Sequence, residues 1–114
     1  MHISQIEFLR HMLDECAYLM HEANQNNFDD FIQDGRLSRA ICRSLEIIGE
    51  ASVKLSPDFK AQYPQIPWRE VSDLRNKIIH HYFGIDYEIV WDTIKTDIPI
   101  LHEWLTIIIS NQIQ

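Results

Sequence analysis

Residues 37–55 read LSRAICRSLEIIGEASVKL, and this stretch decides the fold class. Its apolar and small residues recur at alternating steps of four and three: Leu37, Ile41, Ser44, Ile48, Ala51 and Leu55. That spacing is typical of the buried seam of a long helix in an antiparallel bundle. The acids Asp29 and Asp30 suit the first turn of such a helix, and Pro57 ends it. Gly35 lies inside this span, so we expect the helix to bend there or to begin after it.

A helix of similar length is predicted before this stretch. From Ile3 onward, apolar residues recur at three- and four-residue steps: Ile6, Leu9, Leu13, Cys16, Ala17 and Met20. This period indicates a helix with one buried face, which we expect to end in the polar run at residues 24–27. After the long helix, residues 56–68 form a connection punctuated by prolines. It contains one short helix with Ser56 as its cap and Pro57 at its first position, and Tyr63 and Trp68 pin it to the bundle.

Two further helices are predicted in the second half of the chain. One opens at Pro67 or Trp68, continues through Val71, Leu74, Ile78 and Ile79, and ends before Gly84. The other begins near Asp86. Its seam consists of Val90, Ile94, Ile98, Leu101, Leu105 and Ile108. Because Pro99 lies within this pattern, we expect a kink or a break just before it.

These elements predict an all-α protein. With 114 residues the chain suits a single domain, residues 1–114. Three Gly and four Pro leave little room for the turns of a many-stranded sandwich or barrel. We therefore expect an antiparallel four-helix bundle with an additional short helix and no sheet.

Charge and cysteine usage restrict the class of partner and the compartment. Ten Lys and Arg against seventeen Asp and Glu give a formal charge of −7, which excludes global attraction to nucleic acid or to an anionic membrane. Residues 1–15 contain no apolar signal segment, and residues 105–109 are too short to span a membrane. We expect a cytoplasmic protein. Cys16 and Cys42 have no CxxC spacing, which favours reduced, buried thiols over a disulfide or a zinc site.

Residues 73–83, DLRNKIIHHYF, gather the strongest candidate chemistry. Arg75 can hold a phosphate through two donors, and a histidine can exchange protons with an oxygen near neutral pH. Together they supply what ribose-assisted RNA cleavage requires. The alternative is structural: Arg75 pairs with Asp73 or Glu70, and the two histidines lie at a frayed helix end. The residues alone leave both interpretations open.

Helical geometry separates these side chains. At about 100° per residue, Arg75 and Tyr82 lie near one meridian of the helix, whereas His80 lies about 140° away on the ridge of Asn76. Either the arginine swings round as the helix loosens before Gly84, or the site takes residues from two chains. We favour the second geometry, because a symmetric dimer brings two copies of this helix end together.

Arg75, His80 and Tyr82 form an R-x4-H-x-Y pattern that resembles the HEPN-domain ribonuclease toxins of the HepT-like family. Four further phrases are similar to family signatures and follow the family's order: residues 43–51 (RSLEIIGEA), 63–68 (YPQIPW), 74–80 (LRNKIIH) and 86–91 (DYEIVW). The resemblance covers nearly the whole chain. The four-residue spacing from arginine to histidine would be weak evidence alone, but these phrases on an all-helical chain of this length are specific.

The resemblance implies a metal-independent endoribonuclease that needs no cofactor, acts as a homodimer and is paired with a minimal nucleotidyltransferase antitoxin. In this family the antitoxin is thought to silence the toxin by transferring adenylate groups to the motif tyrosine, here Tyr82. The same carry-over gives Arg75 phosphate and transition-state binding, His80 proton transfer, and Asn76 a supporting role in positioning. The role of His81 stays open.

A basic stripe on the long helix is the other charged feature. Arg36, Arg39 and Arg43 lie on one ridge that could follow an RNA backbone or an acidic partner. Glu46 and Glu50 continue that ridge, so we favour a face on which Arg39 and Arg43 pair within the helix. The remaining candidates have structural interpretations. We interpret Trp68, Trp91 and Trp104 as core or interface anchors, and His2, His11, His21 and His102 as ordinary residues without metal-ligand spacing.

A second function class remains on the sequence alone. The chain could be a non-catalytic helical module that supports a nucleotidyltransferase and uses Arg75 only to hold nucleotide. The charge of −7 favours this alternative slightly, because a free ribonuclease benefits from electrostatic steering. The RNA target, the cleavage-site preference and the stoichiometry with an antitoxin do not follow from the residues.

Overall fold

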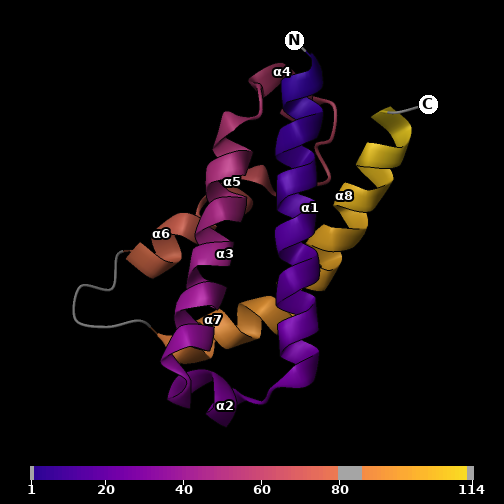
Figure 1. Ribbon diagram of the computed structural model, residues 1–114. Helices are drawn as coiled ribbons and strands as arrows, with labels where there is room; N and C mark the ends of the chain where they lie inside the picture. The colour runs from indigo at the N-terminus through magenta and orange to yellow at the C-terminus, as the bar shows by residue number, and fades with distance from the viewer. Residues whose placement is uncertain (1, 80–85, 113–114) are drawn as a thin grey trace.

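The computed structural model describes residues 2–79 and 86–112, and within these ranges the chain is helical without a strand (Figure 1). In chain order the elements are α1 (His2–Gln25), α2 (Phe28–Gln33), α3 (Gly35–Lys54), α4 (Pro57–Ala61), α5 (Trp68–Ser72), α6 (Leu74–Ile79), α7 (Tyr87–Asp92), the π-helical segment η1 (Thr93–Asp97) and α8 (Ile98–Gln112). The predicted all-α bundle with additional short helices is confirmed.

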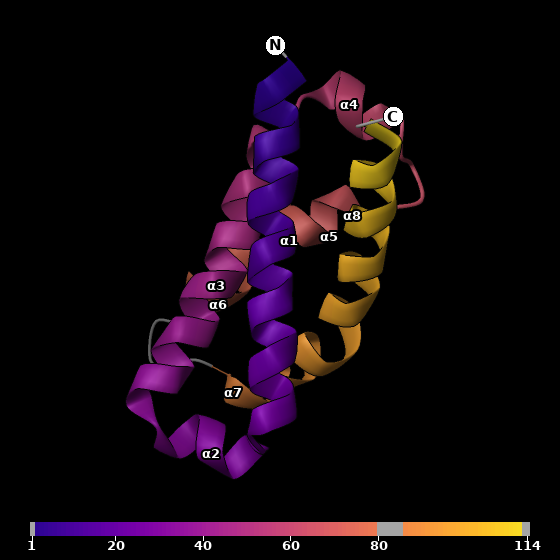
Figure 2. The same cartoon turned by 45° about the vertical axis from the view of Figure 1, so that its right-hand side comes forward.

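Three long helices build the body of the molecule. α1 packs between α3 and α8 and runs antiparallel to both (Figures 1 and 2). α2 and α7 lie together at one end of this body, and α4 lies at the opposite end. α5 and α6 lie against α3, so the chain returns to the long helix before it crosses to α7 (Figure 1).

The buried seams confirm two of the predicted helical faces. On α3 the predicted seam residues from Ile41 to Leu55 are buried, and on α7, η1 and α8 all six predicted seam residues are buried. The seam predicted for α1 is partly wrong: Met12, Leu19 and Ala23 are in the core, while Ala17 is exposed. The cause is that α1 contacts α3 on one side and α8 on the other, so its buried arc is wider than a single seam.

The long helix begins later than Asp29 or Asp30, which lie instead in the first turn of α2. Asp34 separates the two helices. Its backbone N–H donates to the Asp30 carbonyl, and its Oδ1 accepts from the N–H groups of Arg36 and Leu37. One residue therefore ends α2 and caps α3, and Gly35 becomes the first residue of the new helix.

Residues 56–68 behave as predicted. The Ser56 hydroxyl accepts from the Phe59 N–H, and Pro57 occupies the first helical turn of α4. The Trp68 indole N–H donates to the carbonyls of Lys60 and Tyr63 at 3.1 Å each, which closes the connection on itself. Trp68, Trp91 and Trp104 are half-buried and pack against the core, so their interpretation as anchors is confirmed.

The other two predicted helices are interrupted. The break before Pro99 is confirmed: η1 widens the helix there, and the Ile98 N–H donates to the Thr93 carbonyl five residues back. The continuous helix expected from Trp68 is wrong, because Asp73 separates α5 from α6. The Asn76 N–H bonds to the Asp73 carbonyl three residues back, a tight turn that replaces the regular ladder. The end predicted at Gly84 lies outside the described residues.

Candidate functional site

The candidate site begins at the first turn of α6, where the structure places Arg75 and Asn76. Both side chains are half-buried. Asn76 donates through Nδ2 to Asp73 Oδ1 at a long distance of 3.5 Å, and its backbone N–H bonds to the Asp73 carbonyl at 2.9 Å. Asp73 therefore orients the amide that follows the arginine. His80, His81 and Tyr82 lie outside the described residues.

Arg75 is not committed to the partners that a structural role would require. Glu70, Asp73 and Arg75 are all described, and no ion pair within 4.0 Å joins Arg75 to either carboxylate in this part of the chain. The alternative in which Arg75 pairs with Asp73 or Glu70 is therefore wrong for the described geometry. Within residues 2–79 and 86–112 the guanidinium of Arg75 makes no ion pair, and its five N–H donors are of the kind that bind a phosphate.

The backbone of α6 is held against α3 by an unusually close approach. Gly49 is buried in α3, and a Cβ built on it would lie 2.9 Å from the Arg75 backbone N and 3.1 Å from Arg75 Cβ. One turn further on, the hydroxyls of Ser52 and Ser72 are 2.9 Å apart. The sequence analysis did not single out Gly49 for this contact. The signal was present, because glycine in a helix interior costs about 1 kcal/mol relative to alanine and needs a packing reason.

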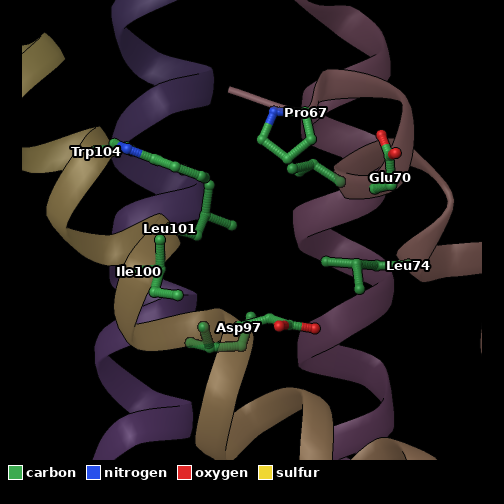
Figure 3. A pocket seen from close by; sticks show the side chains of 9 residues that line it. Pro67, Glu70, Leu74, Asp97, Ile100, Leu101 and Trp104 are labelled. Carbon is green, nitrogen blue, oxygen red and sulfur yellow. The ribbon is translucent and has the colours of Figure 1, made fainter. Parts of the chain in front are cut away.

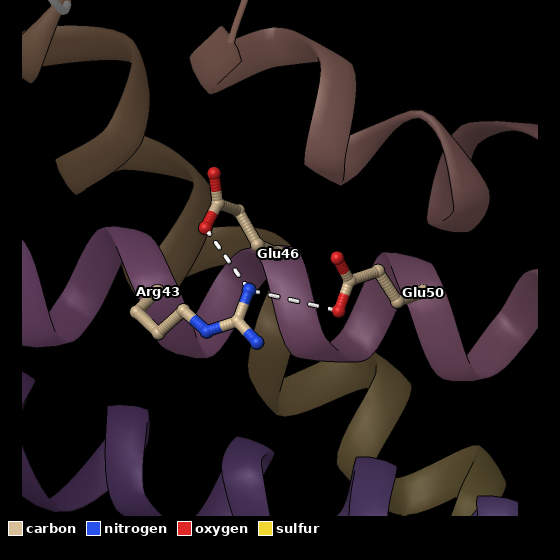
Figure 4. A network of polar contacts seen from close by, with 3 residues as sticks. All are labelled: Arg43, Glu46 and Glu50. Carbon is tan, nitrogen blue, oxygen red and sulfur yellow. Dashed lines mark hydrogen bonds and ion pairs between the residues drawn. The ribbon is translucent and has the colours of Figure 1, made fainter.

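The basic stripe on α3 divides into two parts. Arg43 Nη1 lies 3.4 Å from Glu46 Oε1 and 3.6 Å from Glu50 Oε1, as the dashed lines in Figure 4 mark. The intrahelical pairing predicted for Arg43 is confirmed. For Arg39 it is wrong, since no ion pair of Arg39 within 4.0 Å occurs among the described residues. Arg39 instead reaches back toward Gly35 at the start of α3.

An apolar groove of about 350 Å³ lies between α5, the first residue of α6, η1 and α8 (Figure 3). Its lining residues are Pro67, Glu70, Val71, Leu74, Asp97, Ile98, Ile100, Leu101 and Trp104. Leu74 precedes Arg75 in the chain and points into this groove, as Figure 3 shows. The first turn of α6 is thus packed tightly on the α3 side and has open space on the α8 side.

The two cysteines are structural. Burial raises the pKa of the Cys16 thiol to about 12, with a smaller contribution from the charge of Glu15. Burial, followed by the charge of Glu46, raises the pKa of the Cys42 thiol to about 11. Both thiols are therefore neutral near pH 7 and poor nucleophiles or metal ligands. Among the described residues, no group of three His, Cys, Asp or Glu side chains is placed to hold a metal ion.

None of the helices within residues 2–79 and 86–112 combines the length and the apolar character that a membrane span requires.

Comparison with known proteins identifies the relatives of this chain. A family model described as "Ribonuclease HepT-like" matches residues 6–108. The chain is 41% identical over 105 residues to a protein of Caldanaerobacter subterraneus subsp. tengcongensis named "Putative RNase", covering 92% of this chain and 94% of that protein. It is 51% identical over 74 residues to the "Probable ribonuclease HepT" of Thermococcus cleftensis, covering 65% of this chain and 67% of that protein. No solved structure matches the chain significantly.

The helical fold and these matches define the class of protein as an endoribonuclease. The chain belongs to the HepT-like ribonuclease family.

Proposed function

We propose that this chain is the toxin of a toxin–antitoxin pair and cleaves RNA without a metal ion. In the proposed reaction a ribose 2′-oxygen attacks the adjacent phosphorus, the bond to the 5′-oxygen breaks, and the products carry a 2′,3′-cyclic phosphate and a 5′-hydroxyl. The single observation that carries the proposal is Arg75. It is half-buried, it lies beyond ion-pair distance of Glu70 and Asp73, and it sits on a chain of the HepT-like ribonuclease family.

Each proposed residue has a chemical role. Arg75 binds the phosphate and stabilises the charge that builds on its oxygens in the transition state. His80 moves the proton between the 2′-oxygen and the leaving 5′-oxygen. Asn76, oriented by Asp73, positions the phosphate beside the guanidinium. An ideal helix would put residue 80 about 140° round from Arg75, and on that expectation we propose that the working site combines the α6 ends of two chains in a homodimer.

Control is proposed to act at Tyr82. A minimal nucleotidyltransferase antitoxin would transfer adenylate from ATP to the phenol oxygen and release pyrophosphate. An ideal helix continued from Arg75 would put residue 82 about 20° from the meridian of Arg75, and on that expectation each added phosphodiester would meet the cation that receives the RNA phosphate. Charge-assisted pairing with Arg75 would then occupy the site in place of RNA.

Cleavage of labelled RNA in EDTA tests the catalytic part. Arg75→Ala and His80→Ala are expected to abolish cleavage and to keep the helical circular dichroism of the parent, whereas His81→Ala is expected to matter less. Product ends carrying a 2′,3′-cyclic phosphate support the 2′-oxygen mechanism. Inactivation by His81→Ala with full activity of His80→Ala would show that the wrong imidazole was chosen.

Intact-mass analysis tests the control. Incubation of the chain with the partner nucleotidyltransferase and ATP is expected to add adenylate masses that are absent from Tyr82→Phe. This variant keeps the ring and loses the acceptor oxygen, so it is expected to cleave RNA and to escape silencing. Additions that persist in Tyr82→Phe would place the acceptor elsewhere.

A second function, a non-catalytic module that supports a nucleotidyltransferase, is favoured by one observation, the formal charge of −7. Such a chain has little long-range attraction for RNA. The two functions separate in the same assay. If the chain is catalytic, the parent cleaves RNA in EDTA and Arg75→Ala does not. If the chain is a binding module, neither the parent nor Arg75→Ala cleaves RNA, and Arg75→Ala loses only nucleotide binding.

A further inference from the structure

The contact between α3 and the first turn of α6 involves main-chain atoms on the α6 side. A Cβ at Gly49 would lie 2.9 Å from the Arg75 backbone N, 3.0 Å from the Ser72 carbonyl oxygen and 3.1 Å from Arg75 Cβ. Flexible side chains can rotate away from such an approach, but backbone atoms cannot. The two helices are therefore as close as they are because residue 49 has no side chain.

Gly49 is not required by the local backbone. It lies inside the regular helix α3, where alanine is the intrinsically better residue and no left-handed conformation calls for glycine. The next contact along α3, made by Ser52, also involves a small residue. Ser52 is fully buried, and its hydroxyl bonds to that of Ser72 at 2.9 Å. Small residues on two successive turns of α3 thus fix the separation of α3 from the α5–α6 junction.

We propose that Gly49 is a positioning residue for Arg75. By setting the distance between α3 and α6, it fixes the point from which the guanidinium extends toward the RNA phosphate. This inference rests on the proposed function of Arg75 as the phosphate-binding group. Gly49 itself touches no substrate and acts through the position of the α6 backbone.

The structure also indicates how the protein responds to a side chain at residue 49. An alanine methyl must move from 2.9 Å to about the 3.4 Å at which ordinary contacts begin, so the start of α6 shifts by about 0.5 Å. Leu74, the first residue of α6, points into the groove of about 350 Å³ (Figure 3). This open space allows the start of α6 to shift while the bundle of α1, α3 and α8 stays folded.

A shift of this size matters for catalysis more than for folding. Displacement of a catalytic group by about 1 Å can lower a rate roughly 100-fold. For Gly49→Ala we expect kcat to fall about 10-fold or more, with a smaller change in KM, because the transition state depends more strongly than RNA docking on the guanidinium position.

The matched control is Gly35→Ala. It adds the same methyl group to the same helix, but at an exposed position where the nearest atom is Arg39 Nη1 at 3.2 Å, the mobile end of a long side chain. We expect Gly35→Ala to cleave RNA at the parent rate and to unfold at the same or a higher temperature. Comparing Gly35→Ala with Gly49→Ala shows whether slower cleavage comes from the place of the added methyl group or from a glycine-to-alanine change in general.

Single-turnover cleavage of labelled RNA in EDTA by the purified chain tests the inference, with Arg75→Lys as a second background. If Gly49 acts through Arg75, Gly49→Ala slows the parent about 10-fold and slows Arg75→Lys much less, so the two effects are not additive. Equal slowing in both backgrounds, or parent activity of a folded Gly49→Ala, overturns the inference. If instead Arg75→Ala cleaves RNA normally, the proposed function of Arg75 fails, which is a distinguishable result.

A second variant covers the case in which Gly49→Ala does not fold. Ser52→Thr keeps the hydroxyl that bonds to Ser72 and adds one methyl group at the next contact along α3. Because Ser52 is fully buried and bonds to Ser72, we expect the added methyl group to displace the α5–α6 junction and to slow cleavage by a folded protein. A folded Ser52→Thr variant with the parent kcat overturns the inference.

Discussion

Replacing Phe31 by alanine removes the side chain that joins α2 to α7. Phe31 is fully buried, and its ring stacks on that of Trp91 at 5.2 Å between centroids and meets that of Tyr87 edge-on at 5.4 Å. Phe28 adds a tilted contact at 6.3 Å. This aromatic cluster anchors α7, the element that begins just after residues 80–85. Its loss therefore loosens the end of the bundle at which α2 and α7 lie together.

The expected cost follows from the burial of Phe31. Truncating a fully buried phenylalanine to alanine costs about 3–5 kcal/mol, and the lost aromatic pairs place Phe31→Ala toward the upper part of that range. A domain of this size has a free energy of unfolding of roughly 6–17 kcal/mol, so a large share of it disappears. At about 4 °C per kcal/mol, Tm falls by roughly 12–20 °C.

Urea unfolding followed by circular dichroism and by tryptophan fluorescence measures this loss, with protein concentration held constant. The control is Ile32→Ala in the same helix, where the side chain is 42% exposed and we expect a change of less than about 1 kcal/mol. If Phe31→Ala were as stable as Ile32→Ala, the assignment of the α2–α7 anchor to the aromatic cluster would be wrong.

Three further predictions concern local interactions. The folded state holds the protons of Cys16 and Cys42 at pH values where the unfolded state has lost them, so the free energy of unfolding falls above pH 9. At pH 10 the two thiols together lower the free energy of unfolding by roughly 3 kcal/mol. Chemical denaturation that gave the same free energy of unfolding at pH 8 and pH 10 would contradict this expectation. Asn27→Ala breaks the capping box with Asp30 and is expected to cost about 1 kcal/mol in urea unfolding, whereas an unchanged midpoint would show that the cap is immaterial. Trp68→Phe removes the indole donor from two carbonyls and is expected to cost about 1–3 kcal/mol in thermal unfolding, and a Tm equal to that of the parent would argue against this pin.

The parts of the fold that could be predicted are the helices whose buried residues recur at a regular helical period. On α3 and α8 the predicted seam residues from Ile41 onward are buried, so counting residues was sufficient. α1 was harder because it is covered on two sides by α3 and α8. The helix breaks at Asp34 and Asp73 each depend on hydrogen bonds made by a single residue. The period of the apolar residues does not reveal such hydrogen bonds, so these breaks could not be predicted.

The candidate site divides in the same way. Arg75 and Asn76 were found from their side-chain chemistry, and the structure adds that Arg75 is out of ion-pair reach of Glu70 and Asp73 within the described residues. The roles of His80 and Tyr82 stay predictions. Gly49, which we propose positions Arg75, was missed because its contact joins helices about 25 residues apart in the chain, and only the backbone of α6 reveals that contact.

The small residues between α3 and α6 also set the order in which the molecule comes apart. α1 packs large apolar side chains against its neighbours. At Gly49 and Ser52, in contrast, α3 meets main-chain atoms of Ser72 and Arg75 and the hydroxyl of Ser72, and these two contacts remove little apolar surface from water. α5 and α6 are also short, so few hydrogen bonds must open to release them. Amide hydrogens of α6 should exchange with solvent through local opening, well before those of α1. We therefore expect the helix that carries Arg75 to open and close locally while the three long helices remain assembled.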